Sequence, residues 1–261
     1  MKRFGLIIVG DEILSGKRQD KHLAHVIGLL AARGLSLSWA QYLGDDRAAL
    51  TAALQRSFAS DDVVFSTGGI GATPDDHTRQ SAAAALGREL VLHPEAAQFI
   101  RQRMIDMNQG SPDSPEGRQR LRMAEFPAGA SIIPNPYNRI AGFSVGDHWF
   151  VPGFPVMAWP MLEWVLETHY ADLFHRVQQA ERAMLVFEAA ESTLTPLMER
   201  VEAAHPLVKV FSLPSVGEAG NGPRSRRHIE LGVKGPASAV PAAWDALCAG
   251  VQELRFEVMD L

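Results

Sequence analysis

The sequence runs Ser66-Thr-Gly-Gly-Ile-Gly-Ala-Thr-Pro-Asp-Asp-His-Thr78 between a short apolar run, 63–67, and an alanine-rich segment with helical spacing. Three glycines let the backbone turn sharply and bring its N–H groups close to a ligand, while the next helix adds its positive N-terminal end. This arrangement favours a phosphate or another anion. The stretch is neither a Walker A loop, because GK[ST] is missing, nor the dinucleotide pattern GxGxxG. Thr73 and Asp76 also have the spacing of a helix cap, so a purely structural role stays open.

Strand and helix patterns alternate on the N-terminal side of this stretch. The apolar run 4–9 predicts a fully buried strand, and further strands are expected within 35–43 and at 63–67. Helices are expected over 47–58 and after Asp20, the latter with its inward positions at Leu23, Val26, Ile27 and Leu30. This alternation predicts an α/β fold with a mostly parallel sheet that is covered on both faces.

The remainder of the chain predicts a second, smaller domain. Before it, a helix is expected over 94–108, a loop over 110–117, strands at 130–133 and 147–151, and a helix ending near Tyr170. A boundary is expected between 170 and 182. Beyond it, a βαββα unit of about 80 residues is predicted from strands at 184–189, 209–213 and 228–233 and helices at 192–204 and 241–254.

The composition argues against several kinds of partner and site. The 25 Lys and Arg against 30 Asp and Glu give a formal net charge of -5, so we expect no membrane partner and no nucleic acid as the main partner. A single cysteine, Cys248, excludes an internal disulfide and a cysteine-built zinc site, and the nine histidines form no HExxH pattern. No apolar run approaches the ~20 residues of a membrane span. We therefore expect a cytoplasmic protein.

A minor alternative for the small domain is contact with RNA. Gly217-Glu-Ala-Gly220 formally matches the GxxG loop of KH domains, and Arg224, Arg226 and Arg227 follow it. The loop falls between two expected strands and carries a glutamate where a phosphate contact would favour a cation. We therefore interpret it as a hairpin loop followed by a solvated basic spot.

Acidic residues follow the expected strands. Asp11-Glu12 comes directly after the first strand, Asp45-Asp46 after the second, and Asp75-Asp76 after the glycine turn. Ligands bind at the carboxyl edge of open α/β sheets, where these carboxylates would meet. Carboxylates beside a phosphate-binding turn would repel the anion unless a divalent ion bridged them, and Mg²⁺ binds through carboxylates and substrate phosphates. The pattern therefore predicts a metal-dependent phosphate site, while a solvated turn or cap is the alternative for each acid alone.

Five segments together closely resemble the molybdopterin-binding (MoaB/Mog-like) domain, in the form found at the N-terminus of competence/damage-inducible protein A (CinA). They are Gly10-Asp-Glu-Ile-Leu-Ser-Gly16, Asp20, Gly44-Asp-Asp46, Thr67 to Thr78 and Val151-Pro-Gly-Phe-Pro155. The resemblance assigns residues 1–172 to this domain, and residues 182–261 look like the small KH-like α+β domain that follows in CinA proteins. The C-terminal amidohydrolase domain of CinA has no counterpart in this sequence, so its activity is not expected.

The resemblance implies a three-layer α/β/α domain that forms a homo-oligomer, a dimer or a trimer. It implies binding of a phosphorylated pterin, such as molybdopterin, or of an adenine dinucleotide, with Mg²⁺ or another divalent metal such as Co²⁺ or Mn²⁺. The implied activities are hydrolysis of a pyrophosphate such as ADP-ribose, or nucleotidyl transfer in molybdenum cofactor biosynthesis. A non-catalytic binding or regulatory module that keeps the pocket is the alternative.

Site residues follow from the same resemblance. It implies metal ligation by Glu12, Asp45 and Asp76 and a catalytic role for Asp76 and Asp45. It implies ligand binding by Gly68, Gly69, Gly71, Thr73, Asp75, Thr78 and Gly153. The sequence departs from the family at His22, where asparagine is usual, and at Asn138-Arg139-Ile140-Ala141, where small residues are usual. We expect bulky Arg139 and Ile140 near the ligand wall, and these departures leave the non-catalytic alternative open.

Overall fold

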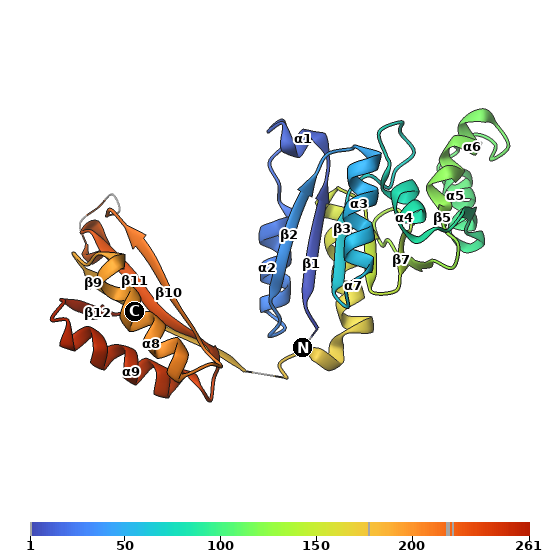
Figure 1. Ribbon diagram of the computed structural model, residues 1–261. Coiled ribbons are helices and arrows are strands. Elements are labelled where there is room, and N and C mark those ends of the chain that lie inside the picture. Colours follow the sequence, from blue (N-terminus) through green and yellow to red (C-terminus); the bar gives the residue numbers. More distant parts are fainter. Residues whose placement is uncertain (1, 177, 218–219, 221) are drawn as a thin grey trace. The chain divides into compact units, whose positions relative to one another are not determined.

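The structure is a computed structural model that describes residues 2–176, 178–217, 220 and 222–261. The chain forms two units, residues 1–174 and residues 175–261, each with its own sheet and its own hydrophobic core (Figure 1). Among the described residues, no helix combines the length and the apolar character needed to cross a membrane.

A six-stranded sheet forms the centre of the first unit, with the strand order β2-β1-β3-β8-β7-β6. The pairs β1–β2, β1–β3 and β3–β8 are parallel, whereas β7 pairs antiparallel with both β6 and β8. The strands are β1 (Phe4–Val9), β2 (Leu37–Leu43), β3 (Val63–Thr67), β6 (Ser131–Ile133), β7 (Gly142–Val145) and β8 (His148–Val151). The central strands β1 and β3 are buried along their whole length, as their unbroken apolar runs predict.

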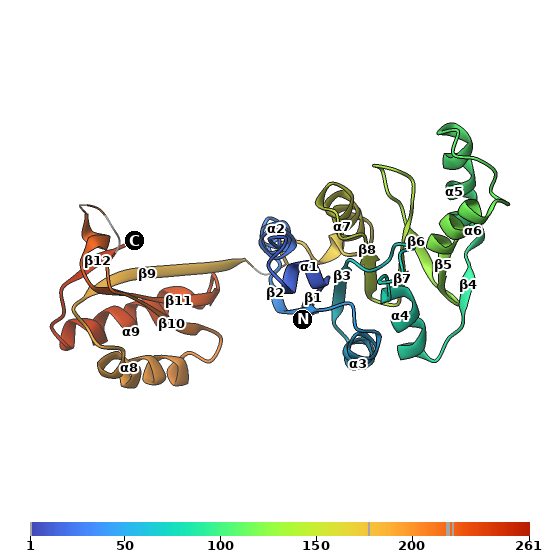
Figure 2. The same cartoon turned by 90° about the horizontal axis from the view of Figure 1, so that it is seen from above.

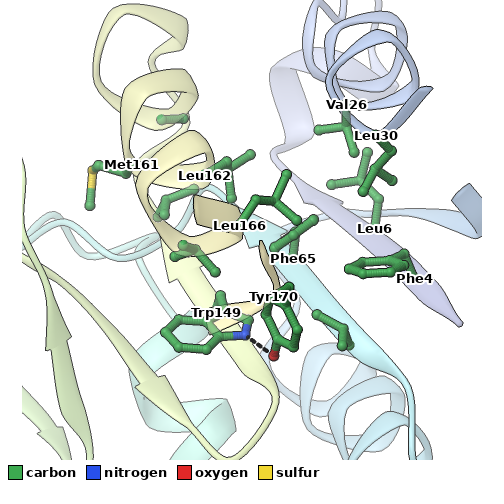
Figure 3. Close-up of a cluster of buried hydrophobic side chains, with 14 of the residues drawn as sticks. Phe4, Leu6, Val26, Leu30, Phe65, Trp149, Met161, Leu162, Leu166 and Tyr170 are labelled. Carbon is green, nitrogen blue, oxygen red and sulfur yellow. Dashed lines mark hydrogen bonds between the residues drawn. The ribbon is translucent and has the colours of Figure 1, made fainter. Parts of the chain in front are cut away.

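Helices cover both faces of this sheet (Figure 2). α2 (His22–Ala31) and α7 (Pro155–His169) pack on the face that receives Phe4, Leu6 and Ile8 of β1. α3 (Arg47–Phe58) and α4 (Thr78–Leu86) pack on the face that receives the alternate residues of that strand. Figure 3 shows the first of these cores, in which Trp149 Nε1 donates to Tyr170 Oη at 2.9 Å. The predicted three-layer α/β/α fold with a mostly parallel sheet is confirmed.

An excursion lies between α4 and β6. It consists of β4 (Leu90–Leu92), α5 (Pro94–Asp106), α6 (Pro115–Leu121), the 3-10 turn η1 (Arg122–Ala124) and β5 (Glu125–Pro127), and β4 pairs with β5. Sequence patterns did not predict these two short strands. The loop expected over 110–117 was predicted too long, because α6 begins at Pro115. Ser114 Oγ accepts a hydrogen bond from Gly117 N and Pro115 occupies the first turn, so α6 begins there.

One helix face was also predicted wrongly. Ile27, expected to point inward, is 48% exposed, whereas Val26 and Leu30 are fully buried. α2 is only 10 residues long, and only His22, Val26 and Leu30 of it are buried. The buried face of the helix is therefore narrower than the face that its apolar residues predicted. Asp20 does satisfy the start of α2, because its carboxylate accepts from the backbone N–H groups of His22 and Leu23.

The second unit is a four-stranded antiparallel sheet in the order β10-β11-β9-β12 with two helices. Its elements are β9 (Gln179–Phe187), α8 (Glu191–Ala204), β10 (Lys209–Ser215), β11 (His228–Pro236), α9 (Val240–Glu253) and β12 (Val258–Asp260), with 3-10 turns at Ala171–Leu173 before it and Pro223–Ser225 within it. The predicted small α+β unit is present, and the three-residue strand β12, which pairs with β9, is an addition to the expected βαββα order. Part of the expected hairpin loop Gly217–Gly220 lies outside the described residues.

Burial of His148 makes the stability of the first unit depend on pH. The ring is 3% exposed, its Nε2 lies 2.9 Å from Ser57 Oγ, and it stacks on Phe58. Burial lowers the pKa of His148 to about 4, although the charges of Asp147 and Asp62 oppose this. A histidine with a lowered pKa in the folded state stabilises the fold above the unfolded pKa of about 6.5, and this stability is lost as the pH falls toward 4.

We therefore expect the free energy of unfolding to fall by roughly 2 kcal/mol between pH 7 and pH 4. Urea unfolding of the wild type and of His148→Gln at several pH values measures this. The substitution should flatten the profile in that window, because glutamine does not titrate. An equally steep profile in both proteins would show that another group is responsible.

Candidate functional site

The carboxyl ends of β1, β2, β3 and β8 open into a cavity of about 450 Å³. Acidic residues and glycines from the loops after these strands line one part of it. Every site residue predicted from the sequence except Thr78 lines the cavity: Glu12, Asp45, Gly68, Gly69, Gly71, Thr73, Asp75, Asp76 and Gly153. Segments far apart in the sequence thus meet at one sheet edge, as the position of ligand sites in open α/β sheets leads one to expect.

The loop after β3 can be built only with glycine at its first turn. Gly68 has φ 99°, and a Cβ there would collide with the carbonyl oxygen of Val9. Thr78 is fully buried and donates from Oγ1 to the carbonyl of Gly68 at 3.0 Å, and its backbone N–H donates to the carbonyl of Gly69. Thr78 therefore shapes the loop from behind and does not line the cavity, in contrast to the ligand contact expected for it.

Arg79 donates to the glycine loop after β3 on the side opposite Thr78. The sequence analysis did not predict this role for Arg79. Its side chain is 1% exposed, and its guanidinium donates to the carbonyls of Gly71 at 2.5 Å, Glu125 at 3.2 Å and Arg122. Gln119 Nε2 donates to the neighbouring carbonyl, that of Ala72, at 2.5 Å. Two successive carbonyls of the glycine loop are thus fixed, that of Gly71 by Arg79 of α4 and that of Ala72 by Gln119 of the excursion.

The spacing along α4 contained a signal for this role. Arg79 lies three and four residues before the buried Ala82 and Ala83, so it occupies the inward face of the helix. An arginine on an inward face needs buried acceptors, and the loop carbonyls supply them.

Two predicted metal ligands already accept hydrogen bonds within the protein. Asp45 Oδ2 accepts from the backbone N of Asp11 at 2.9 Å, and Asp11 Oδ1 accepts from the backbone N of Asp45 at 3.2 Å. Asp76 Oδ2 accepts from Thr73 N at 2.8 Å and from Thr73 Oγ1 at 2.5 Å. The Thr73–Asp76 pair therefore forms, but it closes a turn, because α4 begins only at Thr78.

Negative charge accumulates at this edge. Burial raises the pKa of Asp45, and the nearby charges of Asp11, Glu12 and Asp75 add to this effect, whereas the backbone N–H of Asp11 opposes it. Carboxylates that raise one another's pKa are stabilised by a bound cation or by protonation.

The oxygen donors of this edge suit a hard divalent cation such as Mg²⁺. Within the described part of the chain, however, no group of three His, Cys, Asp or Glu side chains lies close enough to hold a metal ion. Glu12, Asp45 and Asp76 thus share the cavity without forming a preassembled metal centre. A cation there would need phosphate oxygens or water as further ligands, which is how Mg²⁺ usually binds.

The other wall of the cavity is formed by Met123, Asn135, Asn138, Ile140, Ala141, Phe154 and Met157. Asn135 Nδ2 donates to Asn138 Oδ1 and to the carbonyl of Ile140, and Arg103 of α5 donates to the carbonyl of Asn138. Ile140 lines the cavity as expected. Arg139 does not: it adopts φ 63°, points away and forms an ion pair with Asp106 at 3.2 Å.

The histidine that replaces the usual asparagine contacts the loop after β8. His22 is buried, and its Nε2 lies 3.0 Å from the carbonyl oxygen of Gly153. This places His22 behind the cavity wall, where it fixes the backbone that carries Gly153 and Phe154.

The basic spot of the second unit is engaged in protein contacts. Arg226 donates two hydrogen bonds of 2.8 Å to the carboxylate of Glu257, and its guanidinium lies 4.4 Å from the ring centre of Phe187. Arg224 pairs with Glu230 at 3.3 Å. These contacts give Arg226 and Arg224 structural partners within their own unit.

Gly71→Ala tests whether the loop geometry serves binding. A Cβ at Gly71 would lie 2.5 Å from Asp76 Oδ2, so the carboxylate must move. We expect an approximately tenfold loss of affinity for a phosphorylated ligand, with less than about 1 kcal/mol lost from the free energy of unfolding. Calorimetry and urea unfolding measure the two quantities.

Gly28→Ala is the matched control. Gly28 lies inside α2, and among the described residues no neighbouring atom comes within 4 Å of the point where a Cβ would lie. Alanine should therefore stabilise the fold by about 0.5–1 kcal/mol and leave binding unchanged. Equal affinities for Gly71→Ala and the wild type would contradict the role of the loop.

Comparisons with known proteins bear on the family of the first unit. Residues 5–172 match the family model described as "Probable molybdopterin binding domain". A "CinA-like protein" of Citrifermentans bemidjiense is 34% identical over 203 residues, which are 76% of this chain and 47% of the relative. A protein of Pyrobaculum calidifontis is 30% identical over 246 residues, 93% of this chain and 92% of its own length.

Among solved structures, CinA of Thermoplasma acidophilum, described as having unknown function, is similar with a TM-score of 0.55 and 27% identity. The match covers 64% of this chain and 98% of that chain. The chain spans about half the length of the CinA-like relatives that it matches.

Proposed function

The chain belongs to the molybdopterin-binding domain family, and we propose that it binds a phosphorylated pterin or an adenine dinucleotide in the cavity at the sheet edge, together with a divalent cation. The observation that carries the proposal is the meeting of the glycine loop with Glu12, Asp45 and Asp76 in one cavity. Backbone N–H groups of such a loop bind phosphate oxygens, and the volume of about 450 Å³ lies in the range of small-molecule sites.

The negative charge of the cavity is the reason for including a divalent cation in the proposal. Four acidic residues, Glu12, Asp45, Asp75 and Asp76, line the cavity, and an anionic ligand is repelled unless positive charge lies between them. Magnesium, manganese and cobalt ions are the candidates, and the family resemblance adds molybdopterin to the candidate ligands. We also propose self-association to a dimer or trimer, which light scattering measures.

In the catalytic form of the proposal the chain hydrolyses a pyrophosphate such as ADP-ribose with water, which releases AMP and ribose 5-phosphate. The alternative reaction transfers a nucleotidyl group from a nucleoside triphosphate to a phosphorylated pterin and releases pyrophosphate. A bound divalent ion supplies polarisation of the phosphoryl oxygens and a more acidic water. Asp76, Asp45 and Glu12 would hold the ion, and the amides of the 68–71 loop would hold the phosphates.

A non-catalytic binding module is the second candidate, and the hydrogen bonds of Asp45 and Asp76 favour it. Both carboxylates accept internal donors, so ligation of a metal must compete with Thr73 and with the Asp11 backbone. A site of this kind can bind a phosphate group without reaching the geometry that turnover requires.

Calorimetry with ADP-ribose, FAD and molybdopterin, in Mg²⁺ and in EDTA, tests binding, and chromatography of the same mixtures tests turnover. Metal-dependent binding with formation of AMP supports the enzyme. Metal-dependent binding with unchanged ligand supports the module. No binding of any of the three ligands in either buffer would overturn the proposal.

A further inference from the structure

Arg18 is an exposed cation that lines the acidic cavity. It lies on the loop between α1 (Asp11–Leu14) and α2, where its backbone N–H donates to the carbonyl of Glu12 at 2.9 Å. This hydrogen bond folds the loop back on itself and fixes the point from which the side chain extends. Of the described residues that line the cavity, Arg18 is the one with a positive charge.

The guanidinium of Arg18 has no carboxylate partner among the described residues. Two other arginines of the first unit, by contrast, each pair with an acid: Arg33 with Glu167 at 2.6 Å and Arg139 with Asp106 at 3.2 Å. Arg18 instead lies over the ring of Phe154, 6.0 Å from its centre. A cation that lines an acidic cavity, and that is steadied by an aromatic ring and not by an acid, keeps its hydrogen-bond donors available.

The partner ring places Arg18 beside the glycine loop. Phe154 follows Gly153, and a Cβ on Gly153 would lie only 3.4 Å from the Cα of Gly68. Phe154 is 53% exposed, so its ring borders the cavity without being part of the core. The loops after β1, β3 and β8 therefore bring the guanidinium and the glycine amides to the same cavity.

We propose that Arg18 is a specificity-determining residue of this cavity, which binds a phosphate oxygen of the ligand without a metal ion. The inference rests on the proposed function, because it needs a phosphorylated ligand in the cavity. Arginine suits this role since its planar group offers up to two parallel donors to a phosphate, which a lysine ammonium cannot. The glycine amides and Arg18 then recognise the phosphates, while a cation neutralises the carboxylates.

The experiment compares Arg18→Met with Lys17→Met. Methionine keeps an unbranched apolar stem but removes the charge, and Lys17 is the adjacent exposed cation, which does not line the cavity. Affinities for ADP-ribose and for adenosine are measured by calorimetry in Mg²⁺ and in EDTA. Thermal unfolding of each variant checks that the fold is retained.

In Mg²⁺ we expect Arg18→Met to bind ADP-ribose about 10- to 100-fold more weakly than the wild type, and any weaker binding that persists in EDTA should fall by the same factor. Its affinity for adenosine should stay within about twofold, because adenosine has no phosphate. Lys17→Met should match the wild type for both ligands, and Arg18→Lys should fall between the two variants.

Two different results would overturn the inference. If the wild type binds ADP-ribose and Arg18→Met binds it equally well, the role of Arg18 is wrong and the proposed function stands. An equal loss for ADP-ribose and adenosine would likewise reduce Arg18 to a packing residue. If the wild type binds neither ADP-ribose nor a phosphorylated pterin, the proposed function fails and the role of Arg18 fails with it.

Discussion

Replacing Arg79 with methionine is expected to lower the free energy of unfolding by about 4 kcal/mol. Methionine fills part of the same space, but the carbonyls of Gly71, Arg122 and Glu125 lose their donor. Each buried carbonyl that loses its donor costs about 1–3 kcal/mol of stability. The variant no longer buries the guanidinium charge, which regains some stability, but this gain is smaller than the cost of the three carbonyls. Urea unfolding measures the change.

The same substitution should also weaken ligand binding. Arg79 connects the glycine loop to η1 and β5, so its loss frees both the loop and the segment that carries Met123 into the cavity. Arg56→Met, on the exposed side of α3, is the control and should change stability by no more than about 0.5 kcal/mol. If Arg79→Met unfolds like this control, Arg79 does not hold the loop.

Asp76→Asn is expected to reduce metal-dependent hydrolysis of ADP-ribose by at least about 100-fold. Asparagine has nearly the same shape and keeps one oxygen that accepts from Thr73, so the turn closed by Oδ2 should persist. The negative charge that would hold the cation is lost. The free energy of unfolding should therefore change by less than about 1 kcal/mol while the rate falls.

Asp245→Asn, an exposed substitution in the second unit, is the control for this experiment and should leave the rate unchanged. If the chain is a non-catalytic module, the affinity for ADP-ribose in Mg²⁺ is compared between the same two variants. We then expect Asp76→Asn to bind about tenfold more weakly than the control. Equal rates and equal affinities in Asp76→Asn and the control would remove Asp76 from the site.

Local patterns were sufficient for the centre of the fold. The apolar runs of β1 and β3 identify buried parallel strands, and the glycines and acids that follow them place the site at one sheet edge. Strands of three or four residues, such as β4, β5, β7 and β12, are too short to show a period. In addition, β4 pairs with β5 and β12 pairs with β9, and both of these pairs join segments that are distant in the sequence.

The details of the site depend on contacts that no local pattern contains. Arg139 points away from the cavity because it forms an ion pair with Asp106 of α5. Thr78 is buried behind the loop, where its hydroxyl donates to the carbonyl of Gly68. Arg79 was predictable from helical spacing, but its acceptors on η1 and β5 were not. Sequence reasoning therefore identified residues that line one cavity, including Ile140 on the wall opposite the glycine loop, but not the other contacts of that wall.

The anomalous scattering of Mn²⁺ in crystals soaked with ADP-ribose tests whether the carboxylates and the glycine loop form one binding site. We expect one manganese peak among the carboxylates of Glu12, Asp45 and Asp76, with the pyrophosphate against the backbone amides of residues 68–71. Manganese and ADP-ribose both found away from this cavity, or a cavity that stays empty at saturating concentrations of both, would contradict this expectation.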